Sequence, residues 1–245
     1  MRVRLLGSLD GPPVLLLHGS PLPSAYLEGL ARFLAVRHRV LVPDLPGYGD
    51  SPRVEHVVAD AHTLLEAQLR GVGTVDLVGV GLGAYRALRL ALGGTVPVRR
   101  VVAVSGFAAL PGAERRRCLA YADILESGGD LCDLLIAHAL AAEQRDTDPQ
   151  LVERCRTWAH GLDPRTWIAE LDAMSSLPDL VPHLPDLRGR LLAIHGEVDG
   201  VVAPARGREL AAAAGHDPVM LPCGHLPLAE LPDTTMRLVA AYLAR

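Results

Sequence analysis

The chain has 245 residues, of which 49% are hydrophobic, and its formal net charge at pH 7 is −4. This length is typical of one α/β domain that carries an insertion, and the apolar content is enough for a large core. The small charge, without any basic stripe, argues against nucleic acid as a partner. The four cysteines form no C-x-x-C pair and no apolar run reaches ~18 residues, so we expect free thiols, no membrane contact and a cytoplasmic location.

Short apolar runs alternate with amphipathic segments through the first half of the chain. Strands are expected over residues 14–17, 39–42, 75–80 and 98–104, and helices over residues 25–36, 55–69 and 82–92. Such runs between helices favour a parallel sheet that is covered on both faces. From about 111 to 184 the pattern is helical or loop-like. Strands return at 191–195 and 219–221, before a last helix over 233–244. We therefore expect a core of residues 1–107 and 186–245 with a helical insertion of residues 108–185.

The glycine-rich turn "GVGLGA", residues 79–84, follows one of these strands. Written as G-x-G-x-x-A, it is similar to a dinucleotide-binding fingerprint. That fingerprint normally opens the first βαβ unit and has an acidic residue at the end of the next strand. Here the next strand leads into Ser105, with no carboxylate. The dinucleotide interpretation is therefore disfavoured, and we expect no cofactor.

Written as G-x-G-x-G, the same turn is similar to a nucleophile elbow with glycine at the nucleophile position. Asp199 follows the expected strand "RLLAIHG" and His225 follows "PVMLP", which is the chain order of acid and histidine after an elbow. Upstream, "LLLHGSP" resembles an oxyanion loop and "VLVPDLPGYGDSP" the loop after the next strand. Over nearly its whole length, the sequence resembles the α/β-hydrolase superfamily, and most of all its small lidded esterases, thioesterases and C–C hydrolases.

This resemblance implies a mostly parallel sheet with helices on both faces and a helical lid inserted after the sixth strand of the family's fold. It implies that Asp199 orients His225, that His225 is the general base, and that the amides of Ser20 and Leu82 form an oxyanion hole. No metal-ligand spacing such as H-E-x-x-H occurs, so we expect no metal site.

The substrate is expected to be a small, largely apolar acyl or aromatic molecule, on the basis of the lid's composition. Tyr121, Trp158 and Trp167 are candidates for lining its pocket, and they are equally candidates for the lid's own packing.

Gly81 is the departure from the family pattern, which has Ser, Cys or Asp at this position. Glycine has no atom that can attack a carbonyl, so an acyl-enzyme on residue 81 is excluded and ester hydrolysis should be poor. Glycine also adopts the positive φ of an elbow without a Cβ penalty, so the fold should be intact.

Three explanations of Gly81 stay open from the sequence. It is an engineered substitution that disables an acyl hydrolase, or a native residue of a lyase or cyclase that uses only the base and the oxyanion hole. Alternatively, the chain is a non-catalytic protein that binds a ligand or partner. The last is suggested by residues 79–85, which are similar to the elbow of the N-myc downstream-regulated family.

Overall fold

The computed structural model describes all residues from 1 to 245 and contains one seven-stranded sheet with the order β1-β3-β2-β4-β5-β6-β7. The edge strand β1 pairs antiparallel with β3, and every other pair is parallel. The mostly parallel sheet predicted from the apolar runs is confirmed. The strands are β1 (Val3–Leu6), β2 (Pro13–Leu17), β3 (Arg39–Pro43), β4 (Val75–Val80), β5 (Val98–Val104), β6 (Leu191–Gly196) and β7 (Val219–Leu221).

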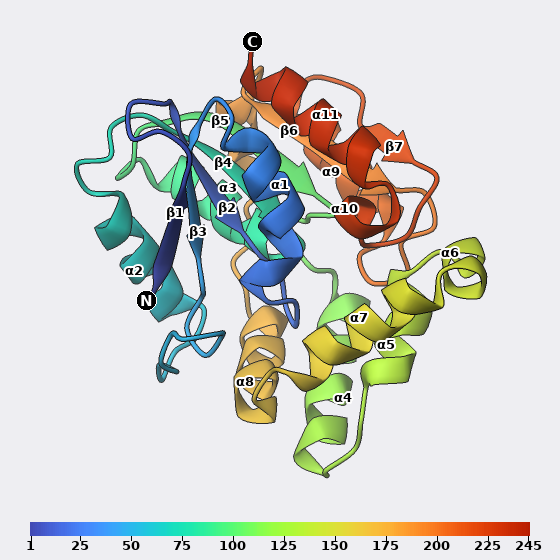
Figure 1. Cartoon of the computed structure of the whole chain (residues 1–245). Coiled ribbons are helices and arrows are strands. Elements are labelled where there is room, and N and C mark those ends of the chain that lie inside the picture. Colours follow the sequence, from blue (N-terminus) through green and yellow to red (C-terminus); the bar gives the residue numbers. More distant parts are fainter.

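The two faces of the sheet bury separate clusters of apolar side chains. In β2, Val14 and Leu16 belong to one cluster, whereas Leu15 and Leu17 belong to the other, because successive side chains of a strand point to opposite faces. Helices α1 and α11 cover one face, and α2, α3 and α9 lie behind the sheet in Figure 1. These helices are α1 (Glu28–Leu34), α2 (Ala59–Leu69), α3 (Leu82–Gly93), α9 (Pro204–Ala214) and α11 (Pro232–Leu243), with the short α10 (Pro227–Glu230) before the last.

Five helices are inserted between β5 and β6 and gather below the sheet in Figure 1. They are α4 (Gly112–Glu126), α5 (Cys132–Ala139), α6 (Ala142–Thr147), α7 (Pro149–His160) and α8 (Pro164–Ser175), and 3₁₀ turns η1 (Ser24–Leu27) and η2 (Val181–Leu187) complete the chain. The insertion follows β5, the fifth strand of this sheet, whereas the family resemblance implied a position after the sixth strand of the family's fold. No helix has the length and apolar character needed to cross a membrane.

The helix expected over residues 55–69 begins at Ala59 instead. Residues 55–58 are not helical, and the carboxylate of Asp60 accepts a hydrogen bond from the amide of His56 at 3.1 Å. The side chains of Val57 and Val58 are buried, and they pack this non-helical segment against the core.

Two glycines at the ends of α3 test how closely this helix packs on the sheet. A Cβ built on Gly83 would lie 2.2 Å from the carbonyl oxygen of Leu17, whereas a Cβ on Gly93 would meet nothing within 4 Å. We expect Gly83→Ala to lower the free energy of unfolding by about 2 kcal/mol or more, since backbone atoms must move. Gly93→Ala should raise it by up to ~1 kcal/mol. Urea unfolding of both variants measures this, and equal effects would contradict the close packing.

Candidate active site

Gly81 occupies the turn between β4 and α3 with φ +54° and ψ −120°. Residues with a side chain rarely adopt this backbone conformation, and glycine does so at no steric cost. The amide of Gly81 donates to the carbonyl of Val104 at 3.0 Å. A Cβ built on Gly81 would lie 3.2 Å from Nε2 of His225, and the only other atom within 4 Å is Cε1 of the same ring. A side chain at this position would therefore point at the imidazole of His225.

The structure brings Asp199 and His225 together from the loops that follow β6 and β7. Nδ1 of His225 donates to Oδ2 of Asp199 at 2.8 Å, and both side chains are buried. The other carboxylate oxygen, Oδ1, accepts from the amides of Val201 and Val202 at 2.9 and 2.8 Å. Both oxygens of Asp199 are thus held, which fixes the direction of the imidazole.

A second histidine, which the sequence analysis did not identify, contacts the same carboxylate. Nε2 of His195, at the end of β6, lies 3.2 Å from Oδ2 of Asp199 and 3.0 Å from the carbonyl of Val202. His195 is fully buried against α9, where a Cβ on Gly207 would lie 2.7 Å from its ring. The available signal was the spacing of four residues between His195 and Asp199, but spacing alone does not show that the side chains meet.

Burial and neighbouring charge act in opposite directions on Asp199. Burial raises the pKa of its carboxyl, but the positive charge of His225 and the hydrogen bonds from His195 and His225 lower it more. The net pKa is well below the usual value, so this carboxyl is ionised throughout the neutral range. The ionised carboxylate of Asp199 therefore faces Nδ1 of His225 across a hydrogen bond of 2.8 Å.

Glu230 and the helical insertion hold the loop that carries His225. Glu230 is buried, and its carboxylate accepts from the amides of Gly224 and Leu226, on either side of His225, at 3.0 and 3.2 Å. The amide of His225 itself donates to the carbonyl of Ala139, at the end of α5, at 2.6 Å. The amide of Ala141 also donates to Glu230 at 2.9 Å, so the end of α5 and the residues after it are part of the scaffold of the histidine loop. Glu230 was not predicted from the sequence, because its partners are backbone amides, which every residue type except proline provides.

The two amides proposed for the oxyanion hole belong to Ser20, in the loop after β2, and to Leu82, which follows Gly81 at the start of α3. Leu82 is the first residue of α3, so its N–H has no acceptor within the helix. The amide of Ser20 has no backbone acceptor. A Cβ on the neighbouring Gly19 would lie 3.7 Å from the nitrogen of Leu82, which shows how closely the two segments approach. Two free N–H donors next to His225 are the arrangement that stabilises a developing oxyanion.

His18, to which the sequence analysis gave no chemical role, joins two loops. Its Nε2 accepts from the amide of Leu45 at 3.1 Å, and its Nδ1 lies 3.0 Å from the carbonyl of Gly19. Burial lowers the pKa of His18 to about 4, against a smaller opposing effect from the Gly19 carbonyl. A neutral imidazole that donates at one nitrogen and accepts at the other fits this structural position.

Two small cavities, of about 50 and about 70 Å³, adjoin the pair and have Ser20, Pro21, Leu135 and Val201 in both walls. His225 lines the smaller one. Tyr121 and Trp167 line the larger one, whose wall is mostly apolar and also includes the charged side chains of Glu114 and Arg117. Two of the three aromatic candidates are thus at a cavity beside the site.

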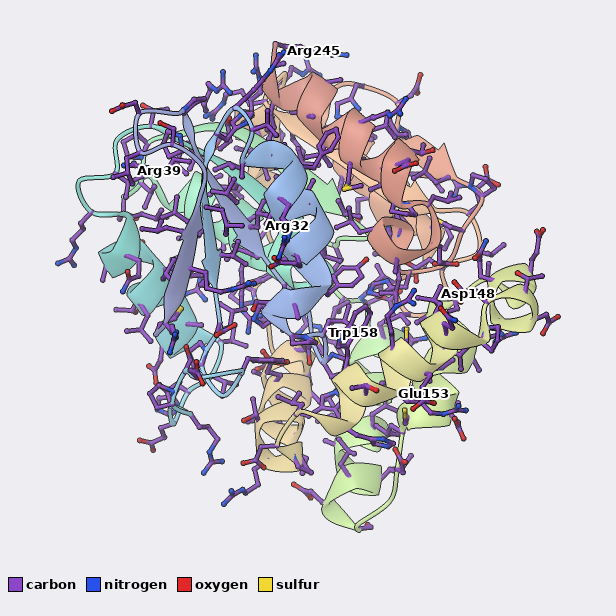
Figure 2. All side chains as sticks on the ribbon, viewed as in Figure 1. Arg32, Arg39, Asp148, Glu153, Trp158 and Arg245 are labelled. Carbon is purple, nitrogen blue, oxygen red and sulfur yellow. The ribbon has the colours of Figure 1, made fainter.

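Trp158 lies elsewhere. Figure 2 places it on α7 where this helix meets the core, and its ring stands edge-on to that of Tyr26 at a centroid distance of 5.6 Å. It borders a different surface hollow, with Pro23 and Tyr48. Packing between the insertion and the core accounts for Trp158 in this arrangement.

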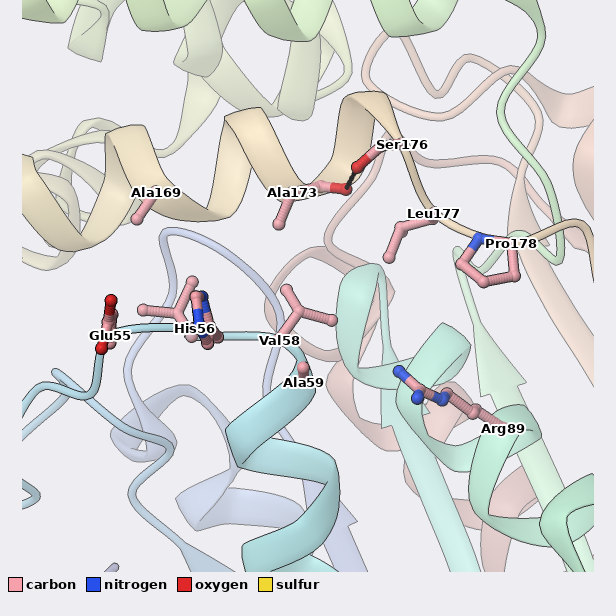
Figure 3. A pocket seen from close by; sticks show the side chains of 11 residues that line it. Glu55, His56, Val58, Ala59, Arg89, Ala169, Ala173, Ser176, Leu177 and Pro178 are labelled. Atoms are coloured by element: carbon pink, nitrogen blue, oxygen red, sulfur yellow. Dashed lines mark hydrogen bonds between the residues drawn. The ribbon is translucent and has the colours of Figure 1, made fainter.

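A larger cleft of about 320 Å³ opens at a distance from the pair (Figure 3). It lies between the start of α2, Arg89 of α3 and the end of α8, and its wall contains neither position 81 nor Asp199 or His225. This cleft is larger than the two cavities beside His225, but the convergent polar groups are at the smaller cavities. The His225 side chain and the free amides therefore define the candidate active site.

The protein-family model described as "Alpha/beta hydrolase family" matches residues 14–238. The chain belongs to the alpha/beta hydrolase family. Over 249 residues it is 29% identical to a pimeloyl-[acyl-carrier protein] methyl ester esterase of Methylococcus capsulatus, covering 96% of this chain and 95% of the relative.

Two further matches of this alpha/beta hydrolase are more limited. One covers only part of the related protein, and the other is a likeness of fold. It is 35% identical to the magnesium-chelatase 30 kDa subunit of Rhodobacter capsulatus over 104 residues, 40% of this chain and only 36% of that protein. A thermophilic esterase from Thermogutta terrifontis superposes with a TM-score of 0.88 over 99% of this chain and 92% of its own, at 24% identity. At this identity the likeness shows the fold alone.

Proposed function

We propose that this alpha/beta hydrolase is the scaffold of a carboxylic ester or thioester hydrolase in which Gly81 occupies the nucleophile position. The observation that carries the proposal is the direction of residue 81, whose Cβ would lie 3.2 Å from Nε2 of His225. The base, the orienting Asp199 and two amide donors surround that point. Every part of an acyl-transfer site is then provided except the attacking atom.

The chemistry of the intact parts follows from their geometry. His225 removes a proton from a nucleophile at its Nε2 face, and Asp199 stabilises the resulting imidazolium. The amides of Ser20 and Leu82 take up the negative charge that develops on a carbonyl oxygen. Without a side chain at position 81, only a water in its place can attack. Removing the nucleophile of a serine hydrolase costs roughly 10⁶ in turnover, so ester hydrolysis by this chain should be very slow.

The substrate class that we propose is a small ester or thioester with an apolar acyl or aromatic group. Support comes from the mostly apolar wall of the cavity that Tyr121 and Trp167 line, and from the esterases among the relatives. The cavities hold only about 50 and about 70 Å³, far below the ~300 Å³ of typical ligand sites. We infer that the helical insertion acts as a lid and shifts to admit a substrate.

Restoring a hydroxyl at position 81 tests the proposal. Gly81→Ser should hydrolyse short-chain nitrophenyl esters and react with a fluorophosphonate probe, and a folded variant that does neither contradicts it.

A second candidate function is base-catalysed lyase or cyclase chemistry in the chain as it stands. It is favoured by His225, whose Nε2 has no hydrogen-bond partner in the protein and faces the space above Gly81. There the base would remove a proton from a carbon acid while the amides hold the enolate oxygen. For any such activity of the unmodified chain, we expect His225→Ala to reduce kcat by at least ~10²-fold. Steady-state kinetics measures this, and activity that survives the change excludes His225 as the base.

A further inference from the structure

Three side chains of the helical insertion converge at a place remote from His225. Asp130 lies in the turn between α4 and α5, Cys132 begins α5, and His160 ends α7. One carboxylate oxygen, the thiol sulfur and one imidazole nitrogen all lie within 4.8 Å of one another. Nε2 of His160 is 3.1 Å from Oδ2 of Asp130.

The backbone around this cluster is held in place. After α4, Gly129 donates to the carbonyl of Ile124 at 2.8 Å and Gly128, at φ +78°, donates to Leu125 at 3.0 Å. This pair of bonds closes the helix with a turn of fixed shape. Oδ1 of Asp130 then accepts from the amide of Cys132 at 2.7 Å, which leaves Oδ2 directed at His160.

The separations suit a tetrahedral metal ion. Zinc bonds of ~2.3 Å to sulfur and ~2.0–2.1 Å to nitrogen and oxygen place neighbouring ligand atoms about 3.3–3.6 Å apart. The 3.1 Å between Asp130 and His160 is already close to this value. The limit of 4.8 Å on the other separations means that they shorten by no more than about 1.5 Å on binding. The side chains of Asp130 and His160 are 65% and 59% exposed, so they can adjust.

We propose that Asp130, Cys132 and His160 form a zinc-binding site, contrary to the absence of a metal expected from the sequence. A thiolate and an imidazole favour Zn²⁺ over Mg²⁺ or Ca²⁺, which prefer oxygen ligands. The nearby Asp133 is paired with Arg156 at 2.8 Å, so water takes the fourth position. On binding, the Cys132 thiol loses its proton to solvent, and His160 carries its proton on Nδ1 while Nε2 coordinates.

The bound ion would connect the end of α7 to the start of α5 within the helical insertion. His160 follows Ala159, and both Ala159 and Cys155 of α7 line the small cavity beside His225. A metal at this place would restrain the helix that forms one wall of the candidate active site. The inference does not depend on the proposed hydrolase function, because neither the ligands nor their geometry involve position 81.

Equilibrium dialysis of the full chain against Zn²⁺ tests the site, with Co²⁺ as a spectroscopic probe. We expect one zinc per chain, a thiolate-to-cobalt charge-transfer band in the near ultraviolet, and a rise in Tm of roughly 5–10 °C at zinc about 100 times above Kd. His160→Ala and Cys132→Ser should each remove the cobalt band or weaken zinc binding at least 10-fold.

Matched controls separate this site from other thiols and imidazoles. Cys118→Ser and His183→Ala change the same residue types outside the cluster and should leave binding unchanged. Since Cys132 is buried and its replacement can perturb folding, the exposed His160→Ala variant, verified by circular dichroism, carries the test. Failure to bind zinc, or a cobalt band that persists in His160→Ala, overturns the proposal.

Discussion

Gly81→Ser is expected to raise the hydrolysis of a short-chain nitrophenyl ester by at least ~10³-fold over the unmodified chain. The new hydroxyl would extend from a Cβ that lies 3.2 Å from Nε2 of His225, within reach of a hydrogen bond to the base. The carboxylate of Asp199 is already bonded to His225, so the new side chain requires the imidazole to shift by only a few tenths of an ångström. Ester turnover and labelling by a fluorophosphonate measure the gain.

Two variants isolate the cause of that gain. Gly81→Ala adds the same Cβ without an oxygen and should show neither turnover nor labelling. Adding His225→Ala to Gly81→Ser should remove most of the restored activity, because the hydroxyl would lose its base. Serine at φ +54° is strained by on the order of 1–3 kcal/mol, so circular dichroism must first show that each variant is folded. Activity that is equal in the alanine and serine variants would refute the assignment of position 81.

Glu170→Ala is expected to destabilise the protein by about 3–5 kcal/mol, the cost of leaving a buried charge unpaired. Oε1 of Glu170, on α8, accepts from Nη2 of Arg86, on α3, at 2.7 Å, and both side chains are at most 2% exposed. The hydroxyl of Tyr48 donates to the other oxygen at 2.5 Å. This carboxylate therefore links the helical insertion to the core. Urea or thermal unfolding measures the loss.

Controls for this prediction come from the same insertion and the same pair. Glu153→Ala removes an exposed carboxylate of α7, labelled in Figure 2, and should change stability by less than ~0.5 kcal/mol. The double variant Arg86→Met with Glu170→Leu removes both charges and should recover much of the loss. A double variant as unstable as Glu170→Ala would mean that packing, rather than the unpaired guanidinium, causes the effect.

The carboxylate of Asp199 contacts both His225 and His195, and only the first of these contacts could be predicted from the sequence. Asp199 and His225 could be predicted, because each follows a recognisable strand and the chain order matches that of the superfamily. His195 could not, because its role depends on β6 ending where its ring meets the same carboxylate oxygen. The role of Glu230 could not be predicted either, because its carboxylate binds backbone amides, and backbone amides are the same for every residue type except proline.

The sequence by itself determined the parallel sheet, the helical insertion and the absence of a nucleophile side chain at position 81. Continuous apolar runs indicate strands that are buried on both faces. Glycine has no side-chain atom that could act as a nucleophile, and this is known from the sequence alone. Only the tertiary structure decided which aromatic side chains line the cavities, with Trp167 and Tyr121 beside the site and Trp158 packed on Tyr26. The same holds for the Asp130, Cys132 and His160 cluster. Trp158 and Tyr26 are far apart in the chain, and His160 is on a different helix from Cys132. Whether such side chains meet depends on how their helices pack, which the local sequence pattern does not contain.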